Sequence, residues 1–344
     1  MPVLSVIVPV YNVEDYLEWC LESLRVQTFE DIEILCVNDG STDASRQVLT
    51  ACQEKDSRIK IIDKDNGGLS SARNVGIKAA TTNLVCFLDS DDRFTPDACE
   101  VIVNTFSKTN ADVVTFGAYC YPESAGYPWL VEHLSPRDVE YEPFRPDLLF
   151  KEMSRPFAWR TACKKGFLQN NGIEFTENLK FGEDQVFHFA IYPRANKTVL
   201  ISNKLYEYRV FREGSLMHKV THDLYTKCSE HIKIVGSILE DWKQGGLLER
   251  YPNQLADWLV DFILNEAMSL EPTQAKEIFG AVGKMWGGYG ELPQVDKIDL
   301  PAATKNVLNL MVNLEKITAL TLKKCRLLYF RQRYGTKTMV RKLL

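Results

Sequence analysis

Residues 84–92 read Leu84-Val85-Cys86-Phe87-Leu88-Asp89-Ser90-Asp91-Asp92, an apolar run that ends abruptly in a polar cluster. Similar apolar runs lie at Leu4–Val10, Ile32–Val37, Ile59–Ile62 and Val113–Phe116. Helix-length segments separate them, at residues 13–27, 43–55, 69–80 and 96–108. Continuous apolar runs that alternate with helices predict an α/β fold with a mostly parallel central sheet and helices on both faces. In such sheets ligands bind beyond the carboxyl ends of the strands, where the polar clusters would gather.

Composition and charge exclude several classes of protein. The 344 residues are 45% apolar and 25% charged, which is ordinary for a globular chain, and the net charge of −5 gives no basic field for nucleic acid. Nine cysteines are scattered singly, which predicts reduced, buried thiols. The first residues lack a signal-peptide pattern, and no apolar run approaches the roughly 20 residues that span a bilayer. We therefore expect a cytoplasmic protein.

The patterning changes twice along the chain. A stretch rich in Tyr, Pro and Trp at residues 118–160 indicates a long insertion. After about residue 220 the chain becomes helical, with helices expected at Leu224–Leu239, Leu255–Leu270 and Lys305–Leu328 and a loop at Gly283–Pro293. We therefore predict an α/β domain over residues 1–220 and a helical C-terminal region over residues 221–344.

Carboxylates in the polar clusters are the first candidates for chemistry. Asp89 and Asp91 are two residues apart at a strand end, so their side chains point the same way and can converge on one cation. Ligands that are all oxygen favour Mg²⁺ or Mn²⁺. An acidic loop that caps the next helix is the alternative reading. Asp184 lies in the first turn of a predicted helix, where amide dipoles keep a carboxylate ionised as a proton acceptor, or where it is only a cap.

Two further loops can hold polar ligands. Asp39 follows the second apolar run, where it can accept a hydrogen bond from a base or sugar, or form an Asx-turn. Gly67 and Gly68 precede a predicted helix that carries Arg73 in its first turns. Amides at a helix start and a guanidinium suit an anion, and a plain turn with Arg73 paired to a surface acid is the alternative.

Five motifs, in this order and spacing, resemble the family 2 glycosyltransferases of the GT-A fold. They are Val8-Pro9-Val10-Tyr11-Asn12, Asn38-Asp39-Gly40-Ser41-Thr42-Asp43, Asn66-Gly67-Gly68 with Ala72-Arg73-Asn74-Val75-Gly76, Leu88-Asp89-Ser90-Asp91-Asp92, and Gly182-Glu183-Asp184. The resemblance covers about residues 2–215 and implies a Rossmann-like GT-A domain. It implies that residues 1–117 bind a nucleotide sugar and that residues 118–220 face the acceptor.

The resemblance also implies roles for single residues. The nucleotide-sugar site would comprise Pro9, Tyr11, Asn12, Asp39, Gly68, Arg73, Asp89 and Ser90. In that site the Tyr11 ring lies against the base and Asp39 hydrogen-bonds the uracil. Asp91 would hold the Mn²⁺ or Mg²⁺ that bridges the diphosphate, Asp89 would hold the ribose or the metal, and Asp184 would be the general base. A late histidine often completes the metal shell in this superfamily; His218 is the candidate, with a surface or core role as the alternative.

The implied activity is inverting transfer of a sugar from a nucleotide sugar, with a UDP-sugar expected. The acceptor would be a hydroxyl group of a glycan or lipid-linked glycan in bacterial surface polysaccharide or glycolipid synthesis. Two alternatives stay open. A sugar nucleotidyltransferase would need a glycine-rich loop where Tyr11-Asn12-Val13-Glu14 stands, and an inactive nucleotide-sugar-binding subunit is disfavoured by the presence of Asp91 and Asp184.

The C-terminal tail is strongly basic. Residues 315–344 carry nine Lys and Arg against one Glu, a net charge of +8, with apolar residues between the cations. An interfacial helix on the anionic inner face of the cell membrane fits this pattern and would bring the enzyme to a lipid-linked acceptor. A helix docked on the domain with its charges solvated fits it equally.

Overall fold

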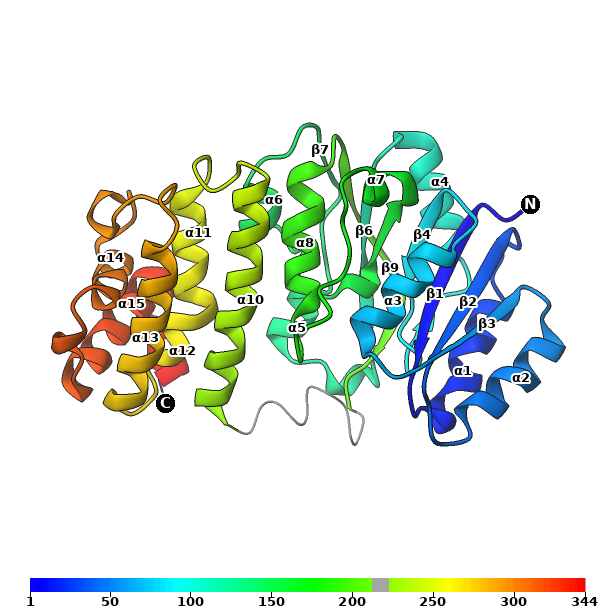
Figure 1. The fold of residues 1–344 in the computed structure, drawn as a ribbon, viewed down its shortest axis with the longest axis horizontal. Helices are drawn as coiled ribbons and strands as arrows, with labels where there is room; N and C mark the ends of the chain where they lie inside the picture. The colour runs from blue at the N-terminus through cyan, green and yellow to red at the C-terminus, as the bar shows by residue number, and fades with distance from the viewer. Residues whose placement is uncertain (212–222, 344) are drawn as a thin grey trace. The chain divides into compact units, whose positions relative to one another are not determined.

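A computed structural model of the chain describes residues 1–211 and 223–343, with side chains up to residue 336. It divides into two compact units, which are described separately (Figure 1). The first comprises Met1–Asn178 and Glu183–Glu213, and the second comprises Leu179–Gly182 and Gly214–Leu344.

The first unit contains a mixed sheet. Its strands are β1 (Leu4–Val10), β2 (Ile32–Asp39), β3 (Ile59–Lys64), β4 (Leu84–Phe87), β5 (Arg93–Phe94), β6 (Val113–Tyr121), β7 (Val139–Tyr141), β8 (Thr161–Lys164) and β9 (Thr198–Arg209). Across the described residues the order is β3-β2-β1-β4-β8-β6-β9-β5, with β7 on β9. The first four strands in this order pair in parallel, and β6 is parallel to β9. The predicted α/β class is confirmed, but β5, β7 and β8 run antiparallel to their neighbours and make the sheet mixed.

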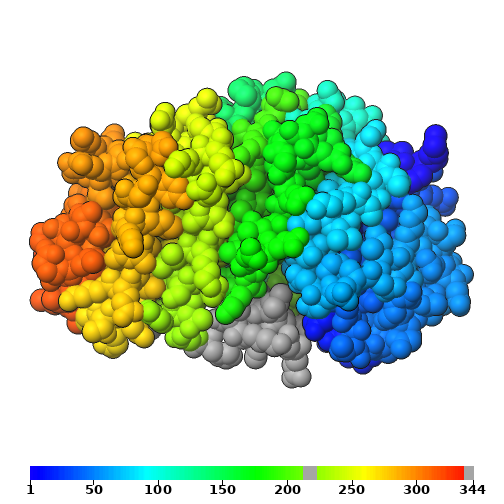
Figure 2. Space-filling model, in the orientation of Figure 1, coloured from blue at the N-terminus to red at the C-terminus, as the bar shows by residue number. Residues whose placement is uncertain are grey.

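Helices cover the sheet and bury apolar side chains, some along one face and α8 on all sides. They are α1 (Glu14–Arg25), α2 (Ser45–Lys55), α3 (Leu69–Ala79), α4 (Ala98–Thr109), α5 (Pro128–His133), α6 (Asp147–Phe150), α7 (Lys165–Asn170) and α8 (Glu183–Arg194). In α3, Gly76 allows close approach to the sheet, since a Cβ there would lie 2.4 Å from Ile7 Cγ2 of β1. The blue and cyan segments of Figure 2, which run from β1 to α4, form a closely packed surface.

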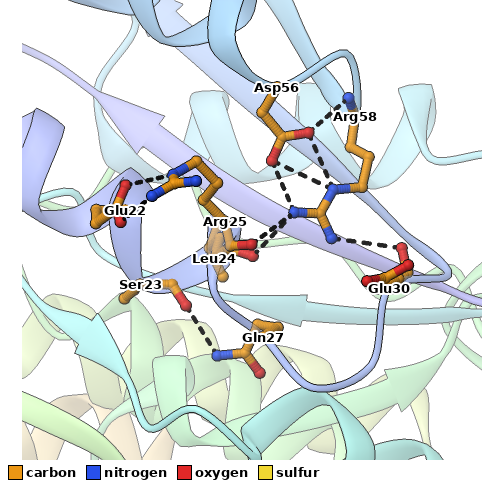
Figure 3. Close-up of polar contacts among 8 residues, drawn as sticks. All are labelled: Glu22, Ser23, Leu24, Arg25, Gln27, Glu30, Asp56 and Arg58. Carbon is orange, nitrogen blue, oxygen red and sulfur yellow. Dashed lines mark hydrogen bonds and ion pairs between the residues drawn. The ribbon is translucent and has the colours of Figure 1, made fainter.

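Arg58 ties the turn before β3 to the end of α1 (Figure 3). Its Nη2 donates to Leu24 O at 3.3 Å and Arg25 O at 3.1 Å, carbonyl groups of the last turn of α1. Such carbonyls have no partner within a helix. The same guanidinium pairs with the Asp56 carboxylate at 2.7 Å. One buried ion pair thus fixes where α1 ends relative to β3.

The second unit is helical. It contains α10 (Leu224–Gln244), α11 (Pro252–Leu259), the π-helix η3 (Val260–Leu264), α12 (Asn265–Ala267), α13 (Pro272–Gly287), α14 (Ala302–Leu308) and α15 (Ala319–Leu343). The helical region is confirmed, but α13 occupies part of the loop predicted at 283–293. Tyr329 and Phe330 of α15 are buried, and Arg333 pairs with Asp257 at 2.6 Å. The described part of the tail is therefore docked on its own unit. Of the helices described, none is long and apolar enough to cross a bilayer.

Candidate active site

Three parallel strands of the first unit end at one edge of the sheet, as β1 pairs with β2 on one side and β4 on the other. Tyr11 directly follows β1, Asp39 ends β2, and Asp89 comes two residues after β4. Side chains from three distant parts of the chain therefore gather at this edge, the position at which open α/β sheets bind ligands.

The loop after β1 is fastened to the loop after β2. Asn12 has a left-handed φ of 50°, which places its Oδ1 to accept from Thr42 N at 2.8 Å while its own N–H donates to Ser41 Oγ at 3.2 Å. Pro9 is buried within β1. The Tyr11 ring stays 48% exposed at the edge of the sheet. An exposed ring held in this way can stack on a nucleotide base.

Asp39 is buried, and its carboxylate is already hydrogen-bonded within the chain. It accepts from Lys64 Nζ at 2.5 Å, Gly67 N at 2.9 Å and Gly68 N at 2.8 Å. The sequence predicted that these two glycine amides bind an anionic ligand. In the structure they donate to the Asp39 carboxylate instead. An ionised carboxylate has about four lone-pair sites, so a hydrogen bond to uracil would be added to these bonds.

The acidic loop after β4 is held by β9. Asp92 is buried, with Oδ2 accepting from Tyr206 Oη–H at 2.7 Å and Oδ1 accepting from Arg209 N at 2.6 Å. Tyr206 Oη also accepts from Asp89 N at 3.1 Å. Asp89 and Asp91 are only half-buried. The loop is thus fixed through Asp92 while two other carboxylates remain within reach of solvent.

Arg73 of α3 links this loop to α8. Its side chain is 2% exposed, with Nη2 donating to Asp89 Oδ1 at 2.8 Å and Nη1 donating to Glu183 Oε1 at 2.9 Å. The guanidinium also lies over the Phe175 ring, 5.2 Å from its centroid. Arg is almost never buried unless it is paired, and the planar fork suits two acids at once. Arg73 therefore fixes Asp89 relative to the start of α8.

Asp184 is adjacent to Glu183 in the first turn of α8. Its Oδ2 accepts from Phe157 N at 2.8 Å. Phe157 has a left-handed φ of 78°. Such a backbone costs a non-glycine residue about 1–3 kcal/mol, and strain of this kind clusters at functional sites. The strained turn aims an N–H group at the carboxylate and holds it in one orientation.

Burial dominates the electrostatics of these acids. It raises the pKa of Asp184 and of Glu183, while Arg73 acts on both in the opposite direction. Burial, and then the charges of Asp91 and Asp89, raise the pKa of Asp92 well above its usual value. Burial acts to lower the pKa of Arg73, but its acidic partners outweigh burial and raise it. A general base with a raised pKa is the better proton acceptor near neutral pH.

The donor set at the acidic loop suits a hard divalent cation. Asp89 and Asp91 offer only oxygen, and Mg²⁺ is typically bound by one or two carboxylates together with substrate phosphates. After burial, the charges of Asp91 and Asp89 each raise the pKa of Asp92, and a cation at this loop would offset that repulsion. Among the described residues no three His, Cys, Asp or Glu side chains are arranged to hold a metal ion by themselves. His218 lies outside the described residues.

Sequence reasoning missed Arg209 at the end of β9. Its Nε donates to Asp91 O at 2.9 Å. Its guanidinium lies against the rings of Tyr16, Trp19 and Tyr121, with centroid distances of 4.9, 4.5 and 5.1 Å. The sequence signal that could have identified Arg209 is a charged residue at the carboxyl end of a strand. The ring partners come from α1 and β6, so only the fold brings them together.

Three kinds of comparison with known proteins agree. Residues 5–167 match the family model described as glycosyl transferase family 2. Glycosyltransferase GlyA of Streptococcus pneumoniae is 34% identical over 250 residues, which cover 68% of this chain, and the match spans 35% of GlyA. Putative glycosyltransferase EpsH of Bacillus subtilis is 34% identical over 261 residues, 75% of this chain and 74% of EpsH. The crystal structure of S. aureus TarS 1–349 in complex with UDP-GlcNAc shares the fold, with a TM-score of 0.69 and 22% identity over 97% of this chain and 92% of that chain. The chain belongs to the family 2 glycosyltransferases.

Proposed function

We propose that this protein is an inverting glycosyltransferase that moves a sugar from a UDP-sugar to a hydroxyl group of a glycan or lipid-linked acceptor. The pathway would be bacterial surface polysaccharide or glycolipid synthesis. The observation that carries the proposal is the double hydrogen bonding of the Arg73 guanidinium. It joins Asp89 of the acidic loop to Glu183, the neighbour of Asp184. TarS was solved with UDP-GlcNAc, which supports a UDP-sugar as the donor here.

Asp184 is the proposed general base. It takes the proton of the acceptor hydroxyl as the oxygen attacks the anomeric carbon, and burial, which raises its pKa, strengthens it for this step. The Phe157 N–H group keeps the carboxylate oriented. Attack opposite the leaving diphosphate inverts the anomeric centre, so an α-linked nucleotide sugar would yield a β-glycoside.

Asp91 and Asp89 are the proposed holders of Mn²⁺ or Mg²⁺. When bound, the cation would neutralise the charge that develops on the leaving diphosphate. Arg73 keeps Asp89 in place, and Asp92 anchors the loop to β9. Tyr11, Asn12 and Asp39 would line the nucleotide part of the same edge.

Asp91→Ala is expected to weaken Mn²⁺-dependent UDP binding by at least about tenfold, because loss of groups at metal sites typically costs this much affinity. The measurement is a melting-temperature panel of UDP-, GDP- and dTDP-sugars with and without Mn²⁺, since a ligand of the native state raises the melting temperature. Asp147→Asn is the control, because this acid is half-exposed and its ion pair is with Lys151, the residue that follows α6. An unchanged Mn²⁺-dependent shift in Asp91→Ala would contradict the assignment.

We also propose that the outer face of α15 contacts an anionic membrane. Leu320 and Leu327 are 77% and 42% exposed. Lys323, Lys324 and Arg331 are exposed beside them, at spacings of three or four residues that place all five on one helix face. These three cations form no ion pair with a described acid. Leucines among unpaired cations are typical of interfacial helices.

Reversal of two of these charges is expected to abolish most membrane binding. The variant Lys323→Glu/Lys324→Glu should float with phosphatidylglycerol vesicles at least about tenfold less than the wild type, since each basic residue contributes about 1 kcal/mol at an anionic surface. The control Lys276→Glu/Lys297→Glu makes the same change in net charge at exposed sites outside α15. Equal flotation of the two variants would contradict the proposed contact.

A further inference from the structure

The exposed aromatic side chains of the described residues all lie in the first unit. They are 41–74% accessible and are Tyr11, Tyr119, Tyr121, Tyr127, Trp129 and Phe211. They follow β1, end β6, follow β9, or lie just before and within α5. Large aromatic rings are normally kept from water, so several exposed rings in one unit indicate a ligand surface.

Several of these rings already have neighbours. Tyr121 packs against Trp19, with ring centroids 5.3 Å apart, and Tyr119 lies 5.1 Å from Lys204 Nζ. Tyr127 and Trp129 are neighbours of each other. Their planes are nearly parallel, 12° apart, with centroids at 6.2 Å, and each ring is about half exposed, at 50% and 47%. We call this pair the aromatic platform.

The aromatic platform is held rigidly. Trp129 is in α5, which Leu130 anchors in the core with 2% exposure. The His133 ring stacks on Trp129 at 4.0 Å, and His133 Nδ1–H donates to Trp129 O at 2.8 Å. The loop after α5 is fastened to β6, since Ala118 N donates to Leu134 O at 2.9 Å. Rings fixed before binding lose little conformational freedom when a ligand arrives.

The helix that carries the platform is tied to the turn that orients Asp184. Arg160, three residues after Phe157, donates from Nη1 to the carbonyl oxygen of His133 in α5. Tyr208 lies 5.7 Å from the Phe157 ring, and Phe157 N is the group that donates to Asp184. Trp159 stacks on both Phe157 and Tyr208, at 5.1 and 5.2 Å. The helix that carries Trp129 is thus fastened to the segment that orients the proposed base.

The chemistry of the platform selects a neutral ring. The C–H groups on one face of a pyranose form a flat apolar surface with a weak positive charge, which packs on the negative face of an aromatic ring. Glu123 and Glu132 are exposed in the same segment, which disfavours a phosphate-rich ligand or an anionic membrane. An acyclic polyol phosphate has no such face and carries the disfavoured charge.

We propose that Tyr127 and Trp129 bind the acceptor as a glycan, by stacking on one of its pyranose rings while a neighbouring sugar presents its hydroxyl group to Asp184. This inference rests on the proposed glycosyl transfer and narrows its acceptor from a glycan or lipid-linked acceptor to a chain of pyranose sugars. A polyol phosphate chain, a membrane surface and a second copy of the protein are the alternative occupants that the test separates.

The test is saturation-transfer NMR on the full chain with cellotriose, chitotriose and maltotriose, and with ribitol 5-phosphate as the non-pyranose probe. We expect transfer from the wild type to the protons of one sugar face in at least one trisaccharide. Trp129→Ala should weaken that binding by about tenfold, and Trp129→Phe, which keeps a ring, should stay within about twofold. Val131→Ala is the matched control, because Val131 is exposed on the same helix and has no ring.

The outcomes are distinct. Absence of trisaccharide binding to the wild type, equal binding by Trp129→Ala, or ribitol 5-phosphate binding that depends on Trp129 would each overturn the proposal. A Trp129-dependent dimer in sedimentation, or Trp129-dependent flotation with vesicles, would also overturn it. The platform would then bind a second copy of the protein or a membrane surface. The UDP-induced shift in melting temperature, measured on the same samples, reports separately on the proposed transferase and should be equal in all variants.

Discussion

Asp184→Asn is expected to lower the rate of UDP release from the donor in the presence of acceptor by about 10²–10⁴-fold, the usual contribution of a positioned general base. Asparagine has the same shape, and its carbonyl oxygen can still accept from Phe157 N, but it cannot take a proton. UDP-sugar binding, followed by the melting-temperature shift, should therefore change little. Glu174→Gln is the matched control, because Glu174 is exposed and pairs only with Lys78.

The pH dependence of the same variant separates a base from a structural acid. Burial raises the pKa of Asp184 above its usual value, so kcat/KM of the wild type should rise as the pH passes through this raised pKa. Asp184→Asn should lack that rise. An unchanged rate, or an unchanged acid limb, would remove Asp184 as the base and leave it a structural role.

The stability of Asp184→Asn should rise although its activity falls. A carboxyl group whose pKa is higher in the folded than in the unfolded state stabilises the fold below the unfolded pKa, and this contribution is lost as the pH rises through the folded pKa. At neutral pH the buried charge of Asp184 therefore costs stability. Asp184→Asn is expected to melt at a higher temperature than the wild type at neutral pH, and the difference should shrink in acid.

The α/β half of the fold was predictable because long apolar runs produce buried parallel strands. The structure has strands at each of the five runs, from Leu4–Val10 to Val113–Tyr121. It also has β5, β7 and β8, which are two to four residues long. Runs that short carry no periodic signal. They pair antiparallel with longer strands, so tertiary pairing rather than local pattern forms them.

Helix α13 shows how glycine can mislead. Gly283 and Gly287 lie in the loop predicted at Gly283–Pro293, yet the buried residues of this helix recur at helical spacing. A Cβ at Gly283 would lie 2.6 Å from Met311 O. Glycine is therefore required there by the close approach of another segment and not by a turn. Sequence alone does not distinguish these two reasons, because both leave the same residue at the position.

The candidate site was predictable as separate residues and not as a network. Asp89 and Asp184 stand out in the sequence because each begins a polar cluster after an apolar run or opens a helix. Glu183 and Phe157 do not stand out, since their importance comes from partners 110 and 27 positions away. Arg73 was identified, but its acidic partners became visible only with the fold.

Arg73→Ala is expected to lower the free energy of unfolding by about 3–5 kcal/mol at neutral pH, the usual cost of leaving one side of a buried ion pair unpaired. Arg73 is 2% exposed, and its removal leaves the carboxylates of Asp89 and Glu183 without this cationic partner. Urea denaturation measures the change. Arg46→Ala is the control, because Arg46 pairs with Asp63 at the surface, where such pairs contribute little. A loss no larger than that of the control would mean that Arg73 does not stabilise the two acids.

Arg73→Lys then separates charge from geometry. Lysine keeps the positive charge that lowers the pKa of Asp184, but it lacks the planar fork that reaches two carboxylates at once. The acid limb of the pH–rate profile should therefore stay where it is in the wild type while turnover falls, because Asp89 and α8 are no longer held together. In Arg73→Ala the acid limb should move to higher pH, since the opposing charge is gone. Wild-type turnover in Arg73→Lys would show that Arg73 acts only as a charge, and its planar geometry would then have no part in positioning the site.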